Sequence, residues 1–316
     1  MTGQWYLTFH GGAGRSDLNS IHVYSADGKK VGKALDRASL PATVELRELR
    51  GFAFGPDGDL YVANAFQNYS QIVRFHGARD QHGKHVFRDV FVQSDATANP
   101  GLSHPFNIVF DGRGDLYVTS QNTSLTLRYY GPRSGSGQPG APMPLPTALT
   151  QMKGLQCCSG TFCASATEVP HGLKVVREAV FAGGHLYVAD RDGDCVRKYD
   201  PETGAYLGAI KAHDLIDKPI HLAVSGDALY IGNRGNESVV KCVLADEKVT
   251  PFIHPQAGGL NNPSGLAFGA DGYFYVASRG SRQILRYRLS DGYPDPHPFI
   301  DNLEDEPEFI GWVERS

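Results

Sequence analysis

The chain has 316 residues, of which 41% are hydrophobic and 20% are charged, with 37 glycines and 19 prolines. This composition suits a globular protein with a sizeable core and many tight turns. A formal net charge of -4 gives no overall basic field, so we expect no nucleic-acid partner. The first residues lack the pattern of a secretion signal, and no apolar run is long enough to span a membrane. We therefore expect a cytoplasmic protein without a membrane partner.

Three strands are predicted near the N-terminus, in WYLTFHGG from Trp5 and then in SIHVYS and KKVGKAL. Beyond them, one two-strand phrase recurs along the chain. Its copies are GFAFGPDGDLYVAN from Gly51, NIVFDGRGDLYVTS from Asn107, EAVFAGGHLYVAD from Glu178, HLAVSGDALYIGN from His221 and GLAFGADGYFYVAS from Gly265. Each copy combines an apolar strand, a tight turn and a second strand with a tyrosine, which predicts a β-hairpin.

A third strand follows each copy, in QIVRF, LTLRYY, CVRKY, VVKCV and QILRYR. The copies recur at intervals that suit blades of about 40 to 50 residues, with two longer intervals that mark insertions. EFIGWV from Glu308 supplies the first strand that the N-terminal copy lacks. The sequence therefore predicts an all-β, six-bladed β-propeller that spans residues 1–316 as a single domain. Its last blade is closed by a C-terminal strand, at about 308–314, that pairs with N-terminal strands at about 4–35.

The third copy can begin in two ways. Either its first strand is EAVF, with His171 in the preceding loop, or it is GLKVV, with Arg177 and Glu178 in a long turn.

Residues 131–170 depart most from the repeat. They open with GPRSGSGQPGAPMPLP and end with LQCCSGTFCASATEVP, which indicates a long insertion that forms a lid or a disordered loop. A protein partner would bind through this insertion. Its cysteines, Cys157, Cys158 and Cys163, lack the paired spacing of a zinc knuckle, so we expect a structural or incidental role. A disulfide, a soft-metal site or thiol chemistry is the alternative.

Polar residues follow the second strand of each predicted blade. The aligned pairs are Asn64-Ala65, Ser120-Gln121, Asp190-Arg191, Asn233-Arg234, Ser278-Arg279 and Phe9-His10. Guanidinium groups bind carboxylates through paired hydrogen bonds, so Arg191, Arg234 and Arg279 predict a small anionic substrate. Asn64, Gln121 and Asn107 are further candidates for contact with it. Alternatively, each arginine pairs with an aspartate or a carbonyl of the neighbouring blade.

Histidines and a carboxylate occur at or near the predicted starts of the first strands of the blades. The aligned pairs there are Arg50-Gly51, Phe106-Asn107, Arg177-Glu178, Ile220-His221, Ser264-Gly265 and Phe309-Ile310. His104, His171 and His221 predict a divalent metal site, with zinc favoured over calcium or magnesium. Solvated loop histidines are the alternative, and nothing indicates an organic cofactor. His221, Glu178 and His10 are the candidates for general acid and base.

These phrases resemble the NHL-repeat pattern, a family of propellers that contains lyases, hydrolases and binding scaffolds. FCASATEV, then PHGL and then HLYVADRDGDCVRKYD are locally similar to peptidylglycine amidating lyase. That resemblance implies a zinc ligand at His171 and a substrate-facing Arg191. His221 lies one position later than the family's Pro-His pattern, and His104 precedes its proline. The virginiamycin B lyase family, with histidines at the starts of its blades, is comparably similar.

The sequence favours a propeller lyase or hydrolase that acts on a small carboxylate-bearing molecule at the central channel, with assistance from a metal. A non-catalytic NHL-type scaffold that binds a ligand or a protein is the alternative.

Overall fold

The computed structural model describes residues 3–11, 16–66, 70–152 and 157–314. The strands of this part of the chain form six antiparallel sheets, five with four strands and one with three. These sheets confirm the predicted all-β, six-bladed β-propeller. The chain divides into two compact units, one made of Met1–Ala34, Arg47–Leu49 and Lys211–Ser316, the other of Leu35–Leu46 and Arg50–Ile210. A single domain over 1–316 stays a prediction.

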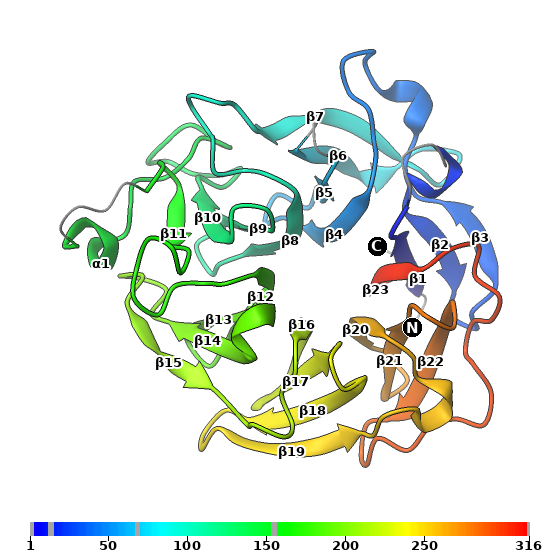
Figure 1. Ribbon diagram of the computed structural model, residues 1–316. Coiled ribbons are helices and arrows are strands. Elements are labelled where there is room, and N and C mark those ends of the chain that lie inside the picture. Colours follow the sequence, from blue (N-terminus) through cyan, green and yellow to red (C-terminus); the bar gives the residue numbers. More distant parts are fainter. Residues whose placement is uncertain (1–2, 12–15, 67–69, 153–156, 315–316) are drawn as a thin grey trace. The chain divides into compact units, whose positions relative to one another are not determined.

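The first unit contains three of the sheets (Figure 1). The closing sheet runs in the order β23 (Pro307–Glu314), β1 (Gly3–Phe9), β2 (His22–Ser25) and β3 (Lys30–Lys33). The next consists of β16 (Pro219–Ser225), β17 (Ala228–Asn233), β18 (Ser238–Val243) and β19 (Lys248–Ile253). The third consists of β20 (Pro263–Phe268), β21 (Tyr273–Ser278) and β22 (Gln283–Arg288).

The second unit contains the other three sheets. One consists of β4 (Leu49–Phe54), β5 (Leu60–Asn64), β6 (Gln71–Arg79) and β7 (His85–Gln93). Another consists of β8 (Pro105–Phe110), β9 (Leu116–Ser120), β10 (Leu125–Tyr129) and β11 (Thr161–Cys163). The last consists of β12 (Val176–Ala182), β13 (His185–Asp190), β14 (Cys195–Tyr199) and β15 (Tyr206–Ile210).

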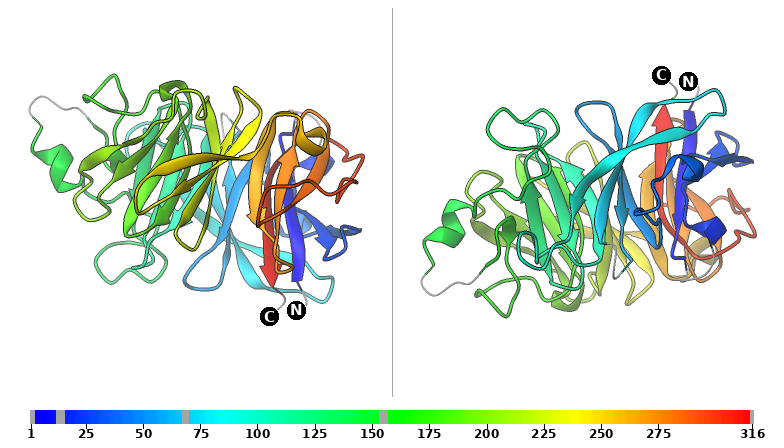
Figure 2. Two further views of the ribbon diagram at one scale, coloured as in Figure 1. Left: turned by 90° about the horizontal axis from the view of Figure 1, so that it is seen from below. Right: turned by 90° about the horizontal axis from the view of Figure 1, so that it is seen from above.

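The closing sheet joins the two ends of the chain. β23 pairs antiparallel with β1, from Gly3 opposite Glu314 to Phe9 opposite Pro307. Both views of Figure 2 show the red β23 beside the blue β1. This pairing confirms the predicted closure, and it removes two open strand edges from the first unit.

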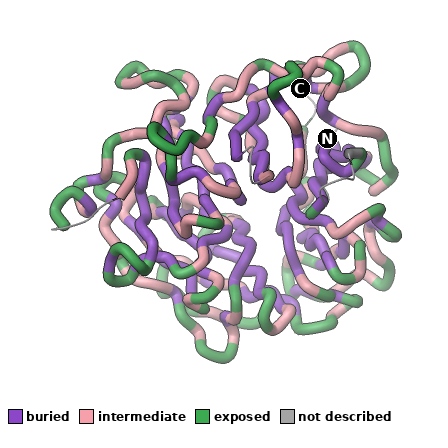
Figure 3. The backbone as a smooth tube through the Cα atoms, turned by 45° about the horizontal axis from the view of Figure 1, so that its top comes forward, coloured by how far each residue is buried: buried purple, intermediate pink, exposed green. Residues whose placement is uncertain are grey.

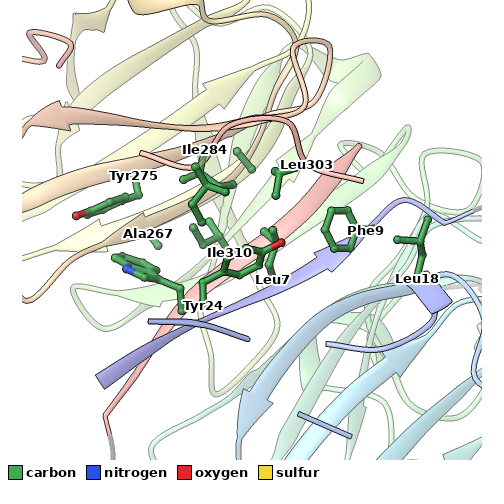
Figure 4. Packing of buried hydrophobic residues seen from close by; sticks show 12 residues of the cluster. Leu7, Phe9, Leu18, Tyr24, Ala267, Tyr275, Ile284, Leu303 and Ile310 are labelled. Atoms are coloured by element: carbon green, nitrogen blue, oxygen red, sulfur yellow. The ribbon is translucent and has the colours of Figure 1, made fainter. Parts of the chain in front are cut away.

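The second strand of each sheet is buried along nearly its whole length, whereas the outer β3 and β19 are largely exposed. Figure 3 shows buried strands and exposed turns. In the first unit, Leu7 and Ile310 pack with Ala267, Tyr275 and Ile284 in one core cluster (Figure 4). Leu7 and its cross-strand partner Ile310 share one face of the closing sheet. Their burial links this sheet to the neighbouring sheet of the same unit.

The repeated tyrosines connect successive sheets. Tyr61 packs edge to face against Phe110 at 5.0 Å, and Tyr230 against Phe268 at 5.4 Å. In each pair the phenylalanine ends the first strand of the next sheet along the chain. Such aromatic pairs add about 0.5–1.5 kcal/mol beyond the burial of their area. The tyrosine of the sequence phrase thus has a packing role between blades.

Residues 131–170 are only partly an insertion. They contain a short helix, α1 (Thr147–Thr150), and also β11, which pairs with β10 as the fourth strand of its sheet. The long segment is therefore the connection between the third and fourth strands of one blade. Among the described residues, no helix is long and apolar enough to cross a membrane.

Candidate functional site

The residues that follow the second strands occupy one repeated backbone position. In five sheets, the backbone N–H of this residue donates to the carbonyl of the residue just before the first strand of the same sheet. The donor–acceptor pairs are His10 to Glu306 (2.8 Å), Gln121 to His104 (3.0 Å), Arg191 to Val175 (2.9 Å), Arg234 to Lys218 (3.0 Å) and Arg279 to Asn262 (3.1 Å). This shared hydrogen bond supports the sequence alignment of these five positions.

The last residue of the second strand, just before this position, binds the loop that precedes the first strand. The amide of Asn64 is buried and donates to the Glu45 carbonyl at 2.8 Å, as Asn233 does to Leu215 at 2.9 Å. At the same place in the third copy, a carboxylate oxygen of Asp190 accepts the N–H of Lys174 and that of Val175, both at 3.0 Å. Asn64, a candidate for substrate contact, therefore holds a loop.

The first strands begin with a repeated β-bulge. Pro105 pairs with Ser120, Pro219 with Asn233 and Pro307 with Phe9. The register shifts between Pro105 and Asn107 in the first case and between Pro219 and His221 in the second. In the third case it shifts on the partner strand, between Leu7 and Phe9. Bulges of this kind re-aim side chains at the ends of strands. The register corrects the alignment in the last blade, because Glu308-Phe309, and not Phe309-Ile310, matches Ile220-His221.

With the corrected alignment, Glu308 becomes one of the residues at the starts of the first strands, where several candidate site residues lie. Its side chain is only 4% exposed, and its Oε2 lies 3.4 Å from Arg279 Nη1 and 3.7 Å from Nδ1 of His10, which is half-exposed. A second carboxylate, Glu306, accepts a hydrogen bond of 2.5 Å from the other terminal nitrogen of Arg279. Two predicted residues, His10 and Arg279, are therefore brought together by a carboxylate that the sequence reasoning missed.

Arg279 and Glu308 bring opposite charges together in a buried place. Burial by itself opposes the charge of Arg279, but the nearby Glu308 and Glu306 outweigh it, so the pKa of the guanidinium is raised. Taking two charges out of water costs several kcal/mol per ion, and only close partners offset this cost. Arg279 therefore pairs with Glu306 and Glu308, at the start of β23 in the closing sheet. Pairing with a neighbouring blade is the alternative role given above for the arginines.

His221 lies in the same unit, on β16. It is 1% exposed, and its ring packs edge to face against Phe309, with the centroids 4.7 Å apart. The first strand β20 contacts both β16 and β23. A Cβ added to Gly265 of β20 would stand 2.7 Å from the backbone nitrogen of Ile310 on β23. The glycine therefore allows β23 to approach β20 closely. The hydroxyl of Ser264 adds a hydrogen bond of 2.8 Å to the Pro307 carbonyl.

The second unit joins two other predicted residues. The side-chain amide of Asn107 donates to Glu178 Oε1 at 3.0 Å, and its oxygen accepts the N–H of Ala179 at 3.2 Å. Beside them, the buried Arg177 lies over the ring of Phe106 at 5.5 Å. β12 starts at Val176, so EAVF belongs to the first strand and His171 to the preceding loop.

Three further candidates are more exposed. Arg191 pairs with its neighbour Asp192 at 2.6 Å. The side chains of Arg234, which is exposed, and of Gln121, which is partly exposed, have no hydrogen bond or ion pair with any residue in the described ranges. Arg234 thus keeps its guanidinium available for a ligand.

The predicted metal ligands have other neighbours. His171 is exposed and stacks on Tyr206 at 5.1 Å, and both His171 and His104 have a left-handed backbone, with φ of 59° and 57°. Over the described residues, no group of three His, Cys, Asp or Glu side chains is arranged to hold a metal ion. The metal site stays a prediction.

All five cysteines are free thiols, and Cys163, Cys195 and Cys242 are buried. Burial, together with the nearby Glu168 carboxylate, raises the pKa of Cys157 to about 12. Such a thiol is scarcely ionised near neutral pH, which agrees with a structural or incidental role.

Comparisons with known proteins support the fold. No protein-family model matches the chain, and no curated protein sequence matches it. Among solved structures, virginiamycin B lyase from Staphylococcus aureus is 15% identical, with a TM-score of 0.53 over 86% of this chain and 75% of that one. A catalytically inactive histidine-to-alanine variant of that enzyme, with quinupristin, has a TM-score of 0.60 at 15% identity, covering 98% and 88% of the two chains. A nidogen–laminin complex has a TM-score of 0.63 at 14% identity, covering 99% and 98%.

The chain is thus a six-bladed β-propeller with a closing blade built from both termini. Its similar structures include a lyase and a protein of a binding complex. The predicted likeness to virginiamycin B lyase is confirmed for the fold, which is all that similarity at this identity shows.

Proposed function

We propose that the chain is a propeller lyase whose general base is His10, in the first unit. The observation that carries this proposal is the half-exposed imidazole of His10 beside the buried carboxylate of Glu308. A carboxylate next to one ring nitrogen orients the imidazole and stabilises its protonated form, so the ring can accept a proton from a substrate. Arg279 acts through Glu308, by holding this carboxylate in its ionised form.

The separation of 3.7 Å between His10 Nδ1 and Glu308 Oε2 is longer than a hydrogen bond. Catalytic hydrogen bonds are often long without substrate and tighten when it binds. In the proposed reaction, the base removes a proton from a carbon next to a carbonyl group. The leaving group departs as the electron pair of that C–H bond forms a double bond, so no water is consumed.

The proposed substrate carries a carboxylate. Arg234 supports this class, because it occupies the position in its blade that His10 and Arg279 occupy in theirs, and its guanidinium is exposed. Arginine binds a carboxylate through two parallel hydrogen bonds. The likeness to virginiamycin B lyase supports the reaction class, and quinupristin is therefore the first probe to use.

The test is turnover measured by liquid chromatography and mass spectrometry. Quinupristin and a set of peptide esters with a free carboxylate are incubated with the wild-type protein and with His10→Ala and Glu308→Gln. We expect both variants to lower kcat about 10²- to 10⁴-fold, the usual contribution of general base catalysis. A lyase gives products whose summed mass equals that of the substrate, whereas a hydrolase adds the mass of one water.

His213→Ala is the matched control, because His213 is a fully exposed histidine beside a carboxylate, Asp214, in the same unit. Its turnover should equal that of the wild type. Unchanged turnover in His10→Ala would remove His10 from the mechanism. Product with an added water would replace the lyase by the hydrolase.

A non-catalytic binding scaffold is the second candidate. The nidogen–laminin complex favours it, since that structure covers nearly the whole of this chain. A scaffold predicts that the wild-type protein turns over none of the probes. The segment 131–170 remains the proposed site for a protein partner.

A further inference from the structure

A cavity of about 560 Å³ lies on the outside of the first unit, between the turn that joins β2 to β3 and the segment that follows β22. The turn contributes Ala26 and Asp27 to its wall, β22 contributes Arg286, and the segment contributes residues 295–299. Figure 1 shows this segment passing close to β3 on its way from β22 to β23. Every lining residue is at least partly exposed, so the side chains of the wall reach the cavity.

The cavity forms where β22 lacks a continuous outer neighbour. Its sheet has three strands, whereas the other five sheets have four. Isolated bridges join Tyr287 to Pro294 and Ile284 to Ile300. The five residues between these bridges on the segment face only two residues of β22. Two of the five, Pro296 and Pro298, have no N–H with which to continue the ladder. The segment therefore bows away from β22 and leaves a space.

The backbone of this segment offers acceptors and almost no donors. The N–H groups of Asp295 and Phe299 donate to carbonyls of β22, at 2.9 Å and 2.8 Å. Between them, His297 has the single remaining backbone N–H. Within the described ranges, the carbonyls of residues 295–298 accept no hydrogen bond, and the exposed imidazole of His297 has no partner. A ligand that donates hydrogen bonds would satisfy this wall.

Two carboxylates add to the acceptors. The side chain of Asp27 is 60% exposed and that of Asp295 is 19% exposed. Hydrogen bonds from Lys29 and Ser25 lower the pKa of Asp27 to about 2, so this carboxylate is ionised at neutral pH. Lys29 lies 2.8 Å from Asp27 but is itself 83% exposed, and an ion pair so open to water is weak. A cationic ligand can therefore take its place.

The positive charge in the wall is already balanced. Arg286 donates from its Nε to Asp295 at 2.6 Å, and its Nη1 lies 3.8 Å from Asp271. Together with Asp27 and Lys29, these groups leave one negative charge in excess. The field beside the cavity thus repels an anion and attracts a cation.

The donors and acceptors narrow the class of cation. A metal ion is disfavoured, because the described residues include no group of three His, Cys, Asp or Glu side chains arranged to hold one. A quaternary ammonium ion has no N–H for the acceptors. A primary ammonium group has three donors and no acceptor, which matches this wall. The apolar surfaces of Ala26, Pro296 and Phe299 suit a hydrocarbon chain attached to it.

We propose that this cavity binds a primary ammonium group on an apolar chain, with Asp27 and the segment 295–298 as its acceptors. A free alkylamine and a lysine side chain of a partner protein share this chemistry. The site does not depend on the proposed lyase activity. Ser25, just before the turn, pairs with Gln4 near the start of β1, whereas His10 follows the other end of that strand.

The test follows the backbone signals of Ala26, Asp27 and His297 in a ¹⁵N–¹H NMR spectrum of the full-length protein. Butylammonium and the peptide acetyl-Gly-Lys-Gly-amide are titrated, with butanol and acetyl-Gly-Gln-Gly-amide as the neutral comparators. We expect saturable shifts with the two ammonium probes, at a dissociation constant of about 1 mM or below, and weaker binding of the neutral probes. Tighter binding of the peptide would indicate a protein lysine, and tighter binding of butylammonium a free amine.

Asp27→Asn is the decisive variant, because it keeps the shape of an exposed side chain and removes its charge. We expect it to weaken butylammonium binding about three- to tenfold, the value of one hydrogen bond. His297→Ala removes a second acceptor and should also weaken binding. Asp291→Asn is the matched control, since Asp291 is 49% exposed, pairs with Arg288 and does not line the cavity. It should bind butylammonium as the wild type does.

A thermal melt confirms that each variant is folded. Three results would each overturn the proposal. They are the absence of saturable shifts with both ammonium probes, binding of butanol or tetramethylammonium as tight as that of butylammonium, and equal binding in Asp27→Asn and Asp291→Asn. The last result would show that only the net charge of the protein matters.

Discussion

His22 shows how one buried residue couples the stability of the closing sheet to pH. It is fully buried on β2, its Nε2 lies 3.1 Å from the Asp17 carbonyl, and its ring packs against Phe9 at 4.8 Å. Its Nδ1 has no partner among the described residues. Burial lowers the pKa of His22, and Lys30 and Lys33 act in the same direction, whereas the Asp17 carbonyl and Glu304 oppose them. The folded chain therefore resists protonation at this place.

We predict that His22 makes the protein less stable in mild acid. The unfolded histidine has a pKa of about 6.5, and the folded one is lower, so below pH about 6.5 the unfolded chain binds a proton that the folded chain refuses. The free energy of unfolding should fall with decreasing pH through this window, by at most about 1.4 kcal/mol per pH unit for one proton. Above the window the contribution is fully present.

Urea denaturation at pH 7.5 and at pH 5.5 measures this effect. His22→Gln should reduce the difference in unfolding free energy between the two pH values. His213→Gln, at an exposed position, should leave that difference unchanged. An equal pH dependence in His22→Gln and the wild type would show that other groups, such as the buried His85, whose pKa burial also lowers, carry the effect.

At the scale of the elements, glycines set how closely the first strands approach. A Cβ on Gly265 would lie 2.7 to 2.9 Å from backbone atoms of β23, and a Cβ on Gly51 would lie 3.0 Å from backbone atoms of β8. Both glycines stand at the same position of the sequence repeat. Because backbone atoms cannot move aside as a flexible side chain can, each site accepts only glycine without a shift of a strand.

Gly265→Ala should therefore destabilise the protein by about 1–3 kcal/mol, the cost of overpacking. It should also displace Glu308 from Arg279, so any turnover should fall with stability. Gly32→Ala is the control, since a Cβ there meets nothing within 4 Å. That variant should be neutral or stabilise the protein by about 0.4–1 kcal/mol. Thermal unfolding of the two variants is measured in parallel. Equal melting temperatures would contradict the close approach of the strands at Gly265.

At the scale of the whole molecule, the pairing of β1 with β23 brings the two ends of the chain side by side (Figure 2). The pair buries Trp5, Leu7, Phe9 and Ile310 within one core cluster. Loss of β23 would leave β1 with an open edge and expose apolar side chains. Continuity of this sheet, and not the order of the chain, should decide whether the molecule folds.

We predict that a circular permutant folds and that a truncated chain does not. The permutant joins residue 316 to residue 1 through a short glycine-rich linker and opens the exposed turn between Asp246 and Glu247. The truncated chain ends at residue 306 and lacks β23. Circular dichroism and thermal melting should show cooperative unfolding for the permutant and its loss in the truncated chain. A truncated chain that melted like the full-length protein would contradict this role of β23.

The sequence by itself determined the blades. Each hairpin joins neighbouring residues through a tight turn, so the repeated phrase, the third strands and the closing segment EFIGWV could be read from local patterns. The tertiary structure alone decided which residues meet. Glu308 reaches His10 and Arg279 only because a bulge resets the register of β23 and because the two chain ends pair. Trp5 and Trp312 stand opposite each other for the same reason. Contacts between residues far apart in the chain depend on strand register, and one residue of register changes which side chain enters the site.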